Sequence, residues 1–546
     1  MSDYDVVFVG AGVAAATAGA RLAAAGAKVV FLEAGPRTDR DEAVTRFRGG
    51  MYPYESPKWA PQPTSADLDH YYVQAGKGKF GSDYERRVGG TTWHWLGTCP
   101  RLLPSDFEMK TRFGIGADWP VSYDDLEPWY VQAEHELGVA GNDDEDAGSP
   151  RSAGFPMPGI PIASGDHVIR DAAAKHGIEV IANPQARNSV DGYQGRAQCC
   201  GNATCIPICP IQAKYDAMVH IDLAEQNGAE VIENAVVFQV DVDDNGEVAG
   251  VHYISPESDD VKVTGKIYVI AANAIETPKL LLMSKNDAMP NGVANSSDLV
   301  GRNLCDHPWA RAAATANFPY GGSRGPLSVA GGDNIRDVDT RSDFAAYRFE
   351  VSHSVGRPDD VARDLIGKGL VGKELYRKIG ELAPHKVQIA ALLEQEPDPE
   401  NRVEPDWDNL DEIGLPRPKL TYWHGEYTKN GWEQAKPLFT KILEEVGATD
   451  IEFSEPGGAG HVLATTRMGD DPATSVTDSY GRTHDHPNLF IAGGSLFPTV
   501  GTANPTLTIV ALALRSAELI GQELGLRVEA TPMASPVGSP IATPVG

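Results

Sequence analysis

The chain has 546 residues, of which 41% are apolar and 23% charged, the balance of a folded globular protein with more than one core. This composition excludes a collagen-like, coiled-coil or disordered chain. The 47 Lys and Arg residues against 76 Asp and Glu residues give a net charge of −29, so we expect no nucleic acid and no anionic membrane surface as a partner.

The N-terminal residues carry no export signal that we can identify. The uncharged stretch 6–20 is too short to span a bilayer, and it follows acidic residues where a signal peptide would carry positive charge. We therefore predict neither a signal peptide nor direct membrane insertion, and we interpret the stretch as a strand followed by a helix.

This stretch predicts a dinucleotide-binding βαβ unit. The apolar run 4–9 predicts a buried strand, and it leads into a G-x-G-x-x-A fingerprint and an alanine-rich helix. Gly10 permits the tight turn, Gly12 lets the backbone approach a pyrophosphate, and Ala15 lets helix and strand pack closely. A second strand ends in Glu33, whose carboxylate is placed to accept hydrogen bonds from a ribose. These residues do not distinguish NAD from FAD.

Five further motifs follow in order: VGGTTWHW at 88–95, DWPVSYDDLEPWY at 118–130, AANAIETPKLLL at 271–282, VGRNLCDHP at 300–308 and NLFIAGGS at 488–495. With the fingerprint they resemble the glucose–methanol–choline (GMC) oxidoreductase family over most of residues 1–525. The resemblance implies FAD rather than NAD. It also implies an α/β (α+β) fold, with a Rossmann-like FAD-binding domain interleaved with a substrate domain built on an antiparallel sheet with helices. The flavin-binding positions that it implies are Gly90, Thr91, Thr92, His94, Ala272, Gly494 and Thr502.

A cluster of cysteines occupies Cys199, Cys200, Cys205 and Cys209. Thiolates suit iron–sulfur clusters or zinc, and this spacing brings several sulfurs into one small volume. Adjacent cysteines suit zinc poorly, and a vicinal disulfide or buried free thiols form the alternative without a metal. The spacing alone leaves a four-iron (4Fe-4S) cluster on four ligands open.

The loop 198–215 that holds these cysteines gives a narrower resemblance within the family. It is similar to the catalytic subunit of the bacterial FAD-dependent glucose, gluconate and fructose dehydrogenases. That resemblance implies a three-iron (3Fe-4S) cluster held by Cys199, Cys200 and Cys205, with Cys209 as the extra thiol.

The C-terminal part supplies a candidate catalytic pair. Oxidation of an alcohol by a flavin requires a base within hydrogen-bond reach of the hydroxyl group. His461 follows a glycine-rich segment, and Asn504 lies forty-three residues further on. By resemblance, His461 takes the hydroxyl proton, while Asn504 orients the hydroxyl and holds the developing alkoxide. A core histidine and a turn asparagine form the structural alternative.

The remaining histidines and cysteines favour structural interpretations. His484 and His486 resemble a metal doublet but have no third ligand nearby, so we predict a capped turn. His307 is interpreted as a turn residue near the flavin. Cys99 and Cys305 are expected to be core thiols because cysteine is among the most often buried residues. His94 offers a covalent link to flavin as the less favoured alternative to simple contact.

The motifs predict two interleaved domains. An Asn-Gly pair at 245–246, between apolar strands, predicts a hairpin. The predicted segments are 1–120, 191–315 and 451–527 for the FAD-binding domain, 121–190 for a helical linker that flanks the substrate domain, 316–450 for the substrate domain, and 528–546 for a disordered proline-rich tail.

Together these features predict an FAD-dependent dehydrogenase of a sugar or polyol. The leading case is oxidation of glucose at C1 to the lactone, with C2 or C3 as alternative positions, and electrons leave through the cluster to an external acceptor. A GMC oxidase that uses oxygen and a non-catalytic electron-transfer subunit are the alternatives. The narrower group implies a small chaperone-like subunit and a multihaem cytochrome c subunit as partners. It favours a periplasmic or cell-surface location through a co-exported partner, with the cytoplasm as the alternative.

Overall fold

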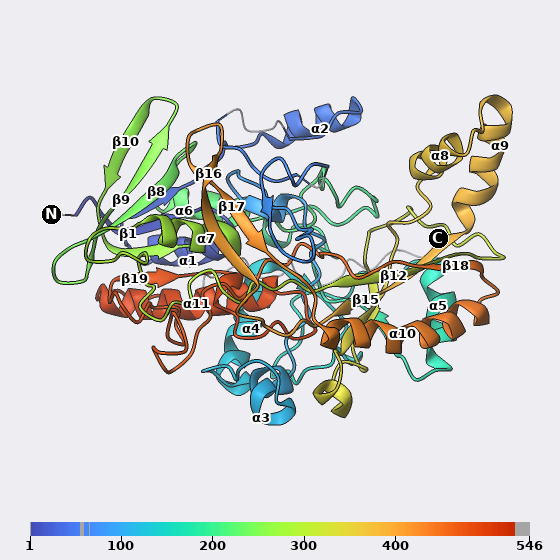
Figure 1. The fold of residues 1–546 in the computed structure, drawn as a ribbon. Helices are drawn as coiled ribbons and strands as arrows, with labels where there is room; N and C mark the ends of the chain where they lie inside the picture. The colour runs from blue at the N-terminus through green and yellow to red at the C-terminus, as the bar shows by residue number, and fades with distance from the viewer. Residues whose placement is uncertain (1, 55–58, 65, 530–546) are drawn as a thin grey trace, which may run out of the picture.

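The fold of the computed structural model is built on two large sheets, shown in Figure 1. The structure describes residues 2–54, 59–64 and 66–529. The predicted proline-rich tail lies outside the described residues from residue 530 onward. None of the helices in these ranges combines the length and apolar character that a membrane crossing requires.

The first sheet is parallel and has five strands in the order β19-β11-β1-β2-β7. Their bounds are β1 Tyr4–Val9, β2 Val29–Leu32, β7 Glu230–Ile232, β11 Gly265–Ile270 and β19 Leu489–Ile491. The central strands are buried on both faces, as their continuous apolar sequences require. Segments from both ends and the middle of the chain therefore build one sheet, as the resemblance implied.

Helices pack against this parallel sheet and against one another. The bounds are α1 Val13–Ala24, α4 Tyr123–Leu137, α6 Met218–Gln226 and α11 Thr506–Glu523. Helix α1 packs against both α6 and α11, and α11 packs in turn against α4. The strand, helix and second strand predicted from the fingerprint are thus confirmed as β1, α1 and β2.

A three-stranded antiparallel sheet extends from the first sheet. Its strands are β8 Val236–Val242, β9 Val248–Ser255 and β10 Ser258–Val263. The turn between β8 and β9 closes with a 3.0 Å hydrogen bond from the amide of Gly246 to the carbonyl of Asp243, which confirms the predicted hairpin.

The second large sheet is antiparallel, with the strand order β18-β12-β15-β14-β13-β5. Its strands are β5 Val180–Ala182, β12 Trp309–Thr315, β13 Ala330–Gly332, β14 Tyr347–Val351, β15 Lys386–Leu393 and β18 Thr449–Phe453. Helices α5 Ser164–Ala174 and α10 Glu426–Glu445 pack on it through a core that includes Trp432 and Phe439. This sheet draws strands from outside the 316–450 segment, because β5 and β12 begin before residue 316 and β18 runs past residue 450.

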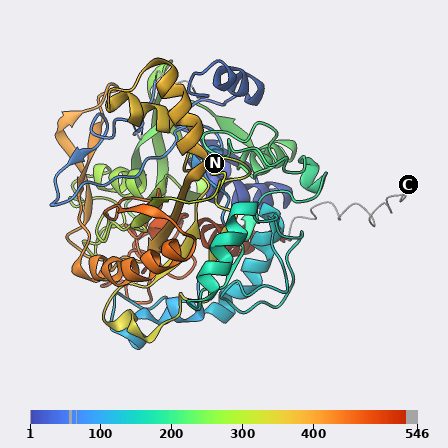
Figure 2. The same cartoon turned by 90° about the vertical axis from the view of Figure 1, so that its right-hand side faces the viewer.

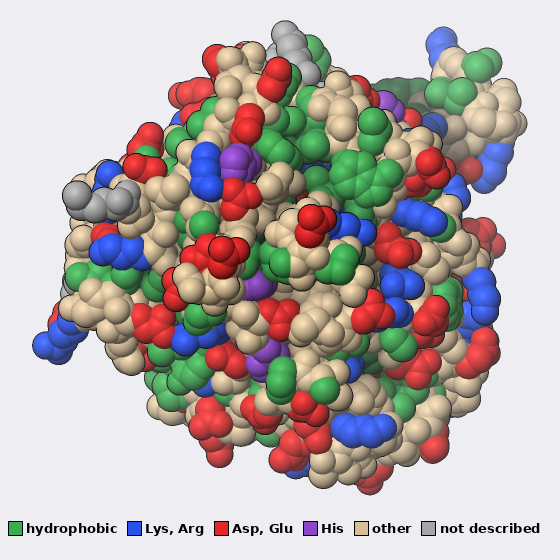
Figure 3. All heavy atoms as spheres, turned by 60° about the vertical axis from the view of Figure 1, so that its left-hand side comes forward, with side chains coloured by type: hydrophobic (Ala, Val, Ile, Leu, Met, Phe, Trp, Pro, Cys, Tyr) green, Lys and Arg blue, Asp and Glu red, His purple; other side chains and the backbone are tan. Residues whose placement is uncertain are grey.

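The other elements frame these two sheets. Helices α8 and α9 form a pair that projects from the body, gold at the upper right of Figure 1 and seen from another side in Figure 2. Acidic side chains are spread over the face in Figure 3 rather than gathered in one patch. The remaining bounds are α2 Arg40–Arg48, α3 Met109–Phe113, α7 Asn273–Met283, α8 Pro358–Gly367, α9 Gly372–Leu382, β3 Val73–Gln74, β4 Val139–Ala140, β6 Gln185–Ala186, β16 Arg402–Leu410 and β17 Pro416–Thr421.

Candidate active site

A cavity of about 720 Å³ opens at the carboxyl ends of the parallel strands and reaches the antiparallel sheet. The β1–α1 turn and the loop after β2 line one side, whereas Trp309, Glu350 and Leu392 line it from the antiparallel sheet. Ligands of parallel α/β sheets bind at the carboxyl ends of the strands, so this is the expected place for a dinucleotide.

The glycine turn shapes one end of the cavity. Gly10 has φ +99°, and a Cβ atom there would lie 2.8 Å from the carbonyl oxygen of Ala271, so only glycine fits. Gly12 precedes α1 and lines the cavity, and a Cβ atom there would meet no atom within 4 Å. Open space therefore lies against the amino end of α1, where a pyrophosphate is favoured. Ala15 is fully buried in α1 and packs in the core rather than lining the cavity.

Glu33 lies at the end of β2 and lines the same cavity. Its carboxylate accepts hydrogen bonds from the amides of Ala11 at 2.9 Å and Gly35 at 3.0 Å. Burial raises the pKa of Glu33 to about 7, although these two hydrogen bonds lower it. The Glu33 carboxylate thus holds the glycine turn in place, and it also lines the cavity where a ribose is predicted to bind.

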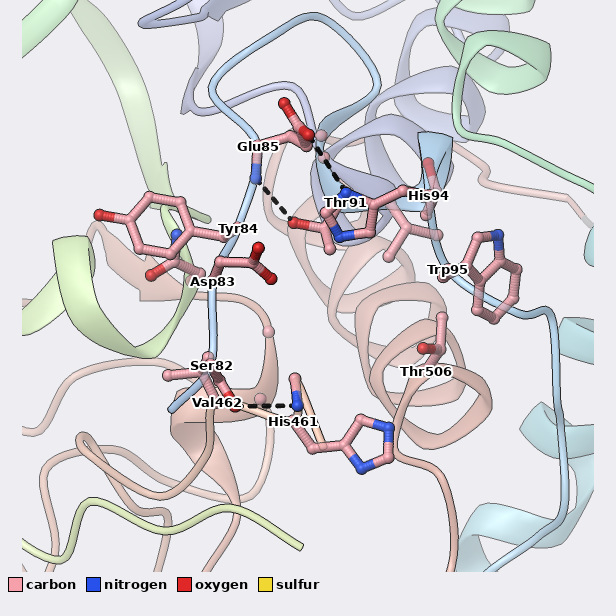
Figure 4. A pocket seen from close by; sticks show the side chains of 18 of the residues that line it. Ser82, Asp83, Tyr84, Glu85, Thr91, His94, Trp95, His461, Val462 and Thr506 are labelled. Carbon is pink, nitrogen blue, oxygen red and sulfur yellow. Dashed lines mark hydrogen bonds and ion pairs between the residues drawn. The ribbon is translucent and has the colours of Figure 1, made fainter. Parts of the chain in front are cut away.

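The segment 90–95 lines the cavity from another side. Gly90, Thr91 and Thr92 lie in the 3-10 helix Gly90–Trp93, and His94 follows it. The backbone amide of Glu85 donates a hydrogen bond to the hydroxyl of Thr91 at 3.2 Å. The Glu85 carboxylate lies 3.2 Å from Nδ1 of His94, and Figure 4 shows both contacts. Burial alone would raise the pKa of Glu85, but the hydrogen bond from His94 and the charge of Arg87 outweigh it and lower the pKa to about 2.

Three other predicted flavin positions lie on later segments. Ala272 precedes α7 and Gly494 begins a short 3-10 helix, and both line the cavity. A Cβ atom at Gly494 would lie 2.6 Å from Leu463, so a larger residue would disturb the segment that carries His461. Thr502 is buried and does not line the cavity.

His461 and Asn504 meet at the cavity. The Nδ2 atom of Asn504 lies 3.4 Å from Nε2 of His461, and both residues line the cavity. The Oδ1 atom of Asn504 is buried without a hydrogen-bond partner among the described residues. Figure 4 shows the ring of His461 on one side of this space, with His94 and Trp95 on the other. The two side chains that the sequence proposed as a catalytic pair are therefore neighbours.

A second histidine, His307, stands behind the first. Its Nδ1 atom lies 3.1 Å from Nδ1 of His461, and its Nε2 atom lies 3.0 and 3.1 Å from the carbonyl oxygens of Val500 and Gly501. Carbonyl oxygens only accept hydrogen bonds, so Nε2 of His307 carries the proton and Nδ1 of His307 is an acceptor. His461 then donates from Nδ1, which leaves Nε2 of His461 as a basic nitrogen facing Asn504.

Both rings are neutral at neutral pH. Burial lowers the pKa of His307 to about 4. Burial, together with the neighbouring His307, lowers the pKa of His461 well below 6.5. The sequence motif identified His307 as a turn residue near the flavin, but its contact with His461 joins segments 154 residues apart and was not predicted.

Asp306 anchors the backbone of this site. Its carboxylate accepts hydrogen bonds from the amides of His307 at 2.7 Å and His461 at 3.1 Å, and also from the hydroxyl of Ser82. Burial raises the pKa of Asp306 to about 6. One carboxylate therefore ties together the two segments that carry the histidines.

The four clustered cysteines line a separate small cavity, together with Arg187 and Lys214. All six cysteines of the chain are free thiols. Within the described ranges, no three Cys, His, Asp or Glu side chains gather closely enough to form a ready metal site. Four thiols are suitable ligands for an iron–sulfur cluster, but their sulfur atoms do not converge on one point in this structure.

The predicted core position of Cys99 and Cys305 is confirmed, and the two histidines at 484 and 486 make separate hydrogen bonds. Cys99 and Cys305 are buried, and burial raises the pKa of both thiols. His484 contacts the hydroxyl of Ser475 at 2.8 Å, while His486 contacts the carbonyl of Gly246 at 2.8 Å. The two rings thus hydrogen-bond different segments of the chain.

The dinucleotide cradle and the histidine–asparagine pair line one cavity, which is the arrangement of an oxidoreductase that binds a dinucleotide cofactor. Models of the GMC oxidoreductase family match residues 4–309 and 397–513. The chain belongs to the GMC oxidoreductase family, and it is therefore an FAD-dependent oxidoreductase that acts on CH–OH groups.

Individual relatives agree with this assignment, and solved structures share the fold. The chain is 38% identical to the fructose dehydrogenase large subunit of Gluconobacter japonicus, over 95% of this chain and 98% of the relative. It is 30% identical to 6'''-hydroxyparomomycin C oxidase of Streptomyces lividus, over 95% of this chain and 92% of the relative. Among solved structures, pyridoxine 4-oxidase from Mesorbium loti aligns with a TM-score of 0.63 at 17% identity, covering 95% and 99% of the two chains. A formate oxidase aligns with a TM-score of 0.65 at 14% identity, covering 96% and 98%. These last two show a shared fold.

Proposed function

We propose that this protein is a dehydrogenase that oxidises a hydroxyl group of a sugar or polyol and passes the electrons through a cysteine-bound iron–sulfur cluster to an external acceptor. The observation that carries the proposal is the chain of contacts from the carbonyls of Val500 and Gly501 through His307 to His461. It leaves an unprotonated nitrogen facing the cavity, beside Asn504.

The cavity fits FAD by its shape and its polar groups. Gly10 and Gly12 leave open space at the amino end of α1, and Glu33 lines the same cavity, where we propose that it binds the ribose. The hydroxyl of Thr98 and the Oδ1 atom of Asn504 are buried, line the cavity and have no partner among the described residues, so polar groups of a ligand could satisfy them. When bound, FAD accepts a hydride, and a cysteine-bound cluster accepts one electron at a time.

The residues of the chain handle the proton. Nε2 of His461 accepts the hydroxyl proton of the substrate, since its other nitrogen is committed to His307. The amide of Asn504 donates a hydrogen bond to the alkoxide as charge develops there. Because the pKa of His461 is low, the proton then passes readily from His461 to solvent. The substrate thereby loses one proton and one hydride and becomes a carbonyl compound.

The proposed substrate class is supported by the relatives. One relative is named the fructose dehydrogenase large subunit, and another is named 6'''-hydroxyparomomycin C oxidase, so both names refer to hydroxyl-bearing compounds. Glucose at C1 is the prediction from the sequence motif, and fructose is the hexose that the first of these names supports. We propose that the substrate is a hexose, and fructose and glucose are the first two compounds to test.

We propose partner subunits on the same basis. The name "large subunit" of the relative describes an assembly of more than one chain. A small subunit and a multihaem cytochrome c are the partners that the motif resemblance implies. Co-purification of the tagged chain with the products of neighbouring genes tests this proposal.

The proposed function is tested with purified protein and an artificial electron acceptor. We expect dye reduction with at least one of fructose, glucose, gluconate and sorbitol, and iron with acid-labile sulfide bound in amounts comparable to FAD. His461→Ala should abolish sugar-dependent dye reduction while it retains FAD. Rapid oxygen consumption without bound iron would instead establish an oxidase, and full activity of His461→Ala would refute the assigned base.

A further inference from the structure

Two buried cations lie side by side beneath the cysteine loop. Arg187 and Lys214 face one another in an antiparallel β-bridge, and both residues are only 1% exposed. Adjacent backbone hydrogen bonds hold this bridge in register. Both side chains line the small cavity that the four cysteines also line. The fold therefore places two positive charges at the thiols, out of contact with solvent.

Lys214 is held by carbonyl groups alone. Its Nζ atom donates to the carbonyls of Trp93 at 3.0 Å and Cys205 at 3.1 Å, and also to that of Trp95. Asp216, which attracts Lys214 from a longer distance, is paired with Arg40 at 2.6 Å. The carbonyls orient the ammonium group but leave its charge uncompensated.

Arg187 is less satisfied still. Its Nη2 atom donates to the carbonyl of Leu96 at 3.0 Å, whereas Nε and Nη1 are buried without a partner in the part of the chain that the structure describes. Buried polar groups are nearly always hydrogen-bonded, and buried charges are nearly always paired. Two buried guanidinium nitrogens without a hydrogen-bond partner, together with two adjacent positive charges, are typical of a site that binds an anion.

We infer that the positive charges of Arg187 and Lys214 lie against the anionic iron–sulfur cluster of the cysteine loop, help to bind it and raise its reduction potential. This inference rests on the proposed function. A thiolate-ligated cluster carries negative charge, and reduction adds one electron, with no ligand bond broken and no proton taken up. Nearby positive charge therefore stabilises the reduced form more than the oxidised form.

Lys214 also connects the two redox sites. The carbonyls of Trp93 and Trp95 that it binds flank His94, on the segment that lines the flavin cavity, while the carbonyl of Cys205 lies in the cysteine loop. A single side chain thus holds both loops at a fixed separation. Arg187 makes a second link to the flavin cavity, because its Nη2 atom donates to the carbonyl of Leu96, which lines that cavity.

The test uses the purified holoenzyme and the variants Arg187→Met, Arg187→Lys and Lys266→Met. Lys266 is an exposed lysine on β11 and controls for the loss of one positive charge. Iron and acid-labile sulfide are measured per FAD, and the midpoint potential is measured by titration with dithionite and mediators, followed by electron paramagnetic resonance. Arg187→Met should lower the potential by about 59 mV, equivalent to a tenfold shift of a one-electron equilibrium.

Arg187→Lys should stay closer to the wild type because it keeps the charge, and Lys266→Met should match the wild type. Loss of the cluster from Arg187→Met with FAD retained would also support the inference, and Arg187→Lys would then report the potential. Equal potentials and cluster contents in the wild type and Arg187→Met would overturn it. Wild-type protein without iron and sulfide would refute the proposed electron path itself, which is a different result.

Discussion

The contact between His307 and His461 makes a quantitative prediction. In the variant His307→Leu, the Nδ1 hydrogen of His461 loses the acceptor that lies 3.1 Å away in the wild type. One neutral hydrogen bond contributes about 0.5–1.5 kcal/mol, so the preference for the tautomer with a free Nε2 falls by roughly 2- to 13-fold. Removal of the base in His461→Ala should cost about 10²- to 10⁴-fold. We therefore expect His307→Leu to lie between the wild type and His461→Ala.

Stopped-flow reduction of the bound FAD by sugar, without oxygen, measures this step directly. His307→Gln should recover most of the rate, because its amide can donate to the Val500 and Gly501 carbonyls while its oxygen accepts from His461. His486→Leu removes a buried histidine elsewhere and controls for loss of packing. A wild-type rate of FAD reduction in His307→Leu would show that His307 does not position the base.

Three further predictions follow from the same geometry. Because the base acts when neutral and its pKa lies well below 6.5, the rate of FAD reduction should stay constant from pH 8 to about 6.5 and fall only in more acidic solution; a loss centred at or above pH 6.5 would contradict the assignment of His461. Asn504→Ala should lower kcat by about 10²-fold with a smaller change in KM, as expected for a group that binds the alkoxide; steady-state dye reduction checks this, and a change in KM alone would argue for simple substrate binding. Gly10→Ala, with its φ of +99° and its 2.8 Å approach to the carbonyl of Ala271, should cost about 1–3 kcal/mol of stability and lower the FAD content; thermal unfolding measures the first and absorbance the second, and an unchanged melting temperature would be inconsistent with that close approach.

The sequence predicts those parts of the molecule that depend on neighbouring residues. The turn at Gly10 and Gly12, the helix after it and the carboxylate of Glu33 follow from spacing, because one βαβ unit contains them all. The Asn-Gly hairpin and the capped turn at His486 are local in the same way. Family motifs placed His461 and Asn504 on one site, which spacing alone could not do.

Residues that meet only through the tertiary fold were not predicted. His307 reaches His461 because Asp306 binds the backbone amides of both, and the sequence contains no signal for that contact. Arg187 directly follows β6 and meets Lys214 through an isolated β-bridge. Thr502, which a motif predicts to contact flavin, is buried and does not line the cavity, so that contact stays a prediction.

The strand order of the parallel sheet has a consequence for biosynthesis. Strand β1 is made first but pairs with β11, which ends at residue 270, and the edge strand β19 ends at residue 491. Asn504 and α11 follow later still. The ribosome must therefore release the chain through α11 before the cofactor cavity can close, so we expect FAD to bind only after that point, to an apoprotein whose long-range strand pairs form slowly. A nascent chain that stops before Asn504 would contain the complete β1–α1–β2 fingerprint but would lack both Asn504 and α11.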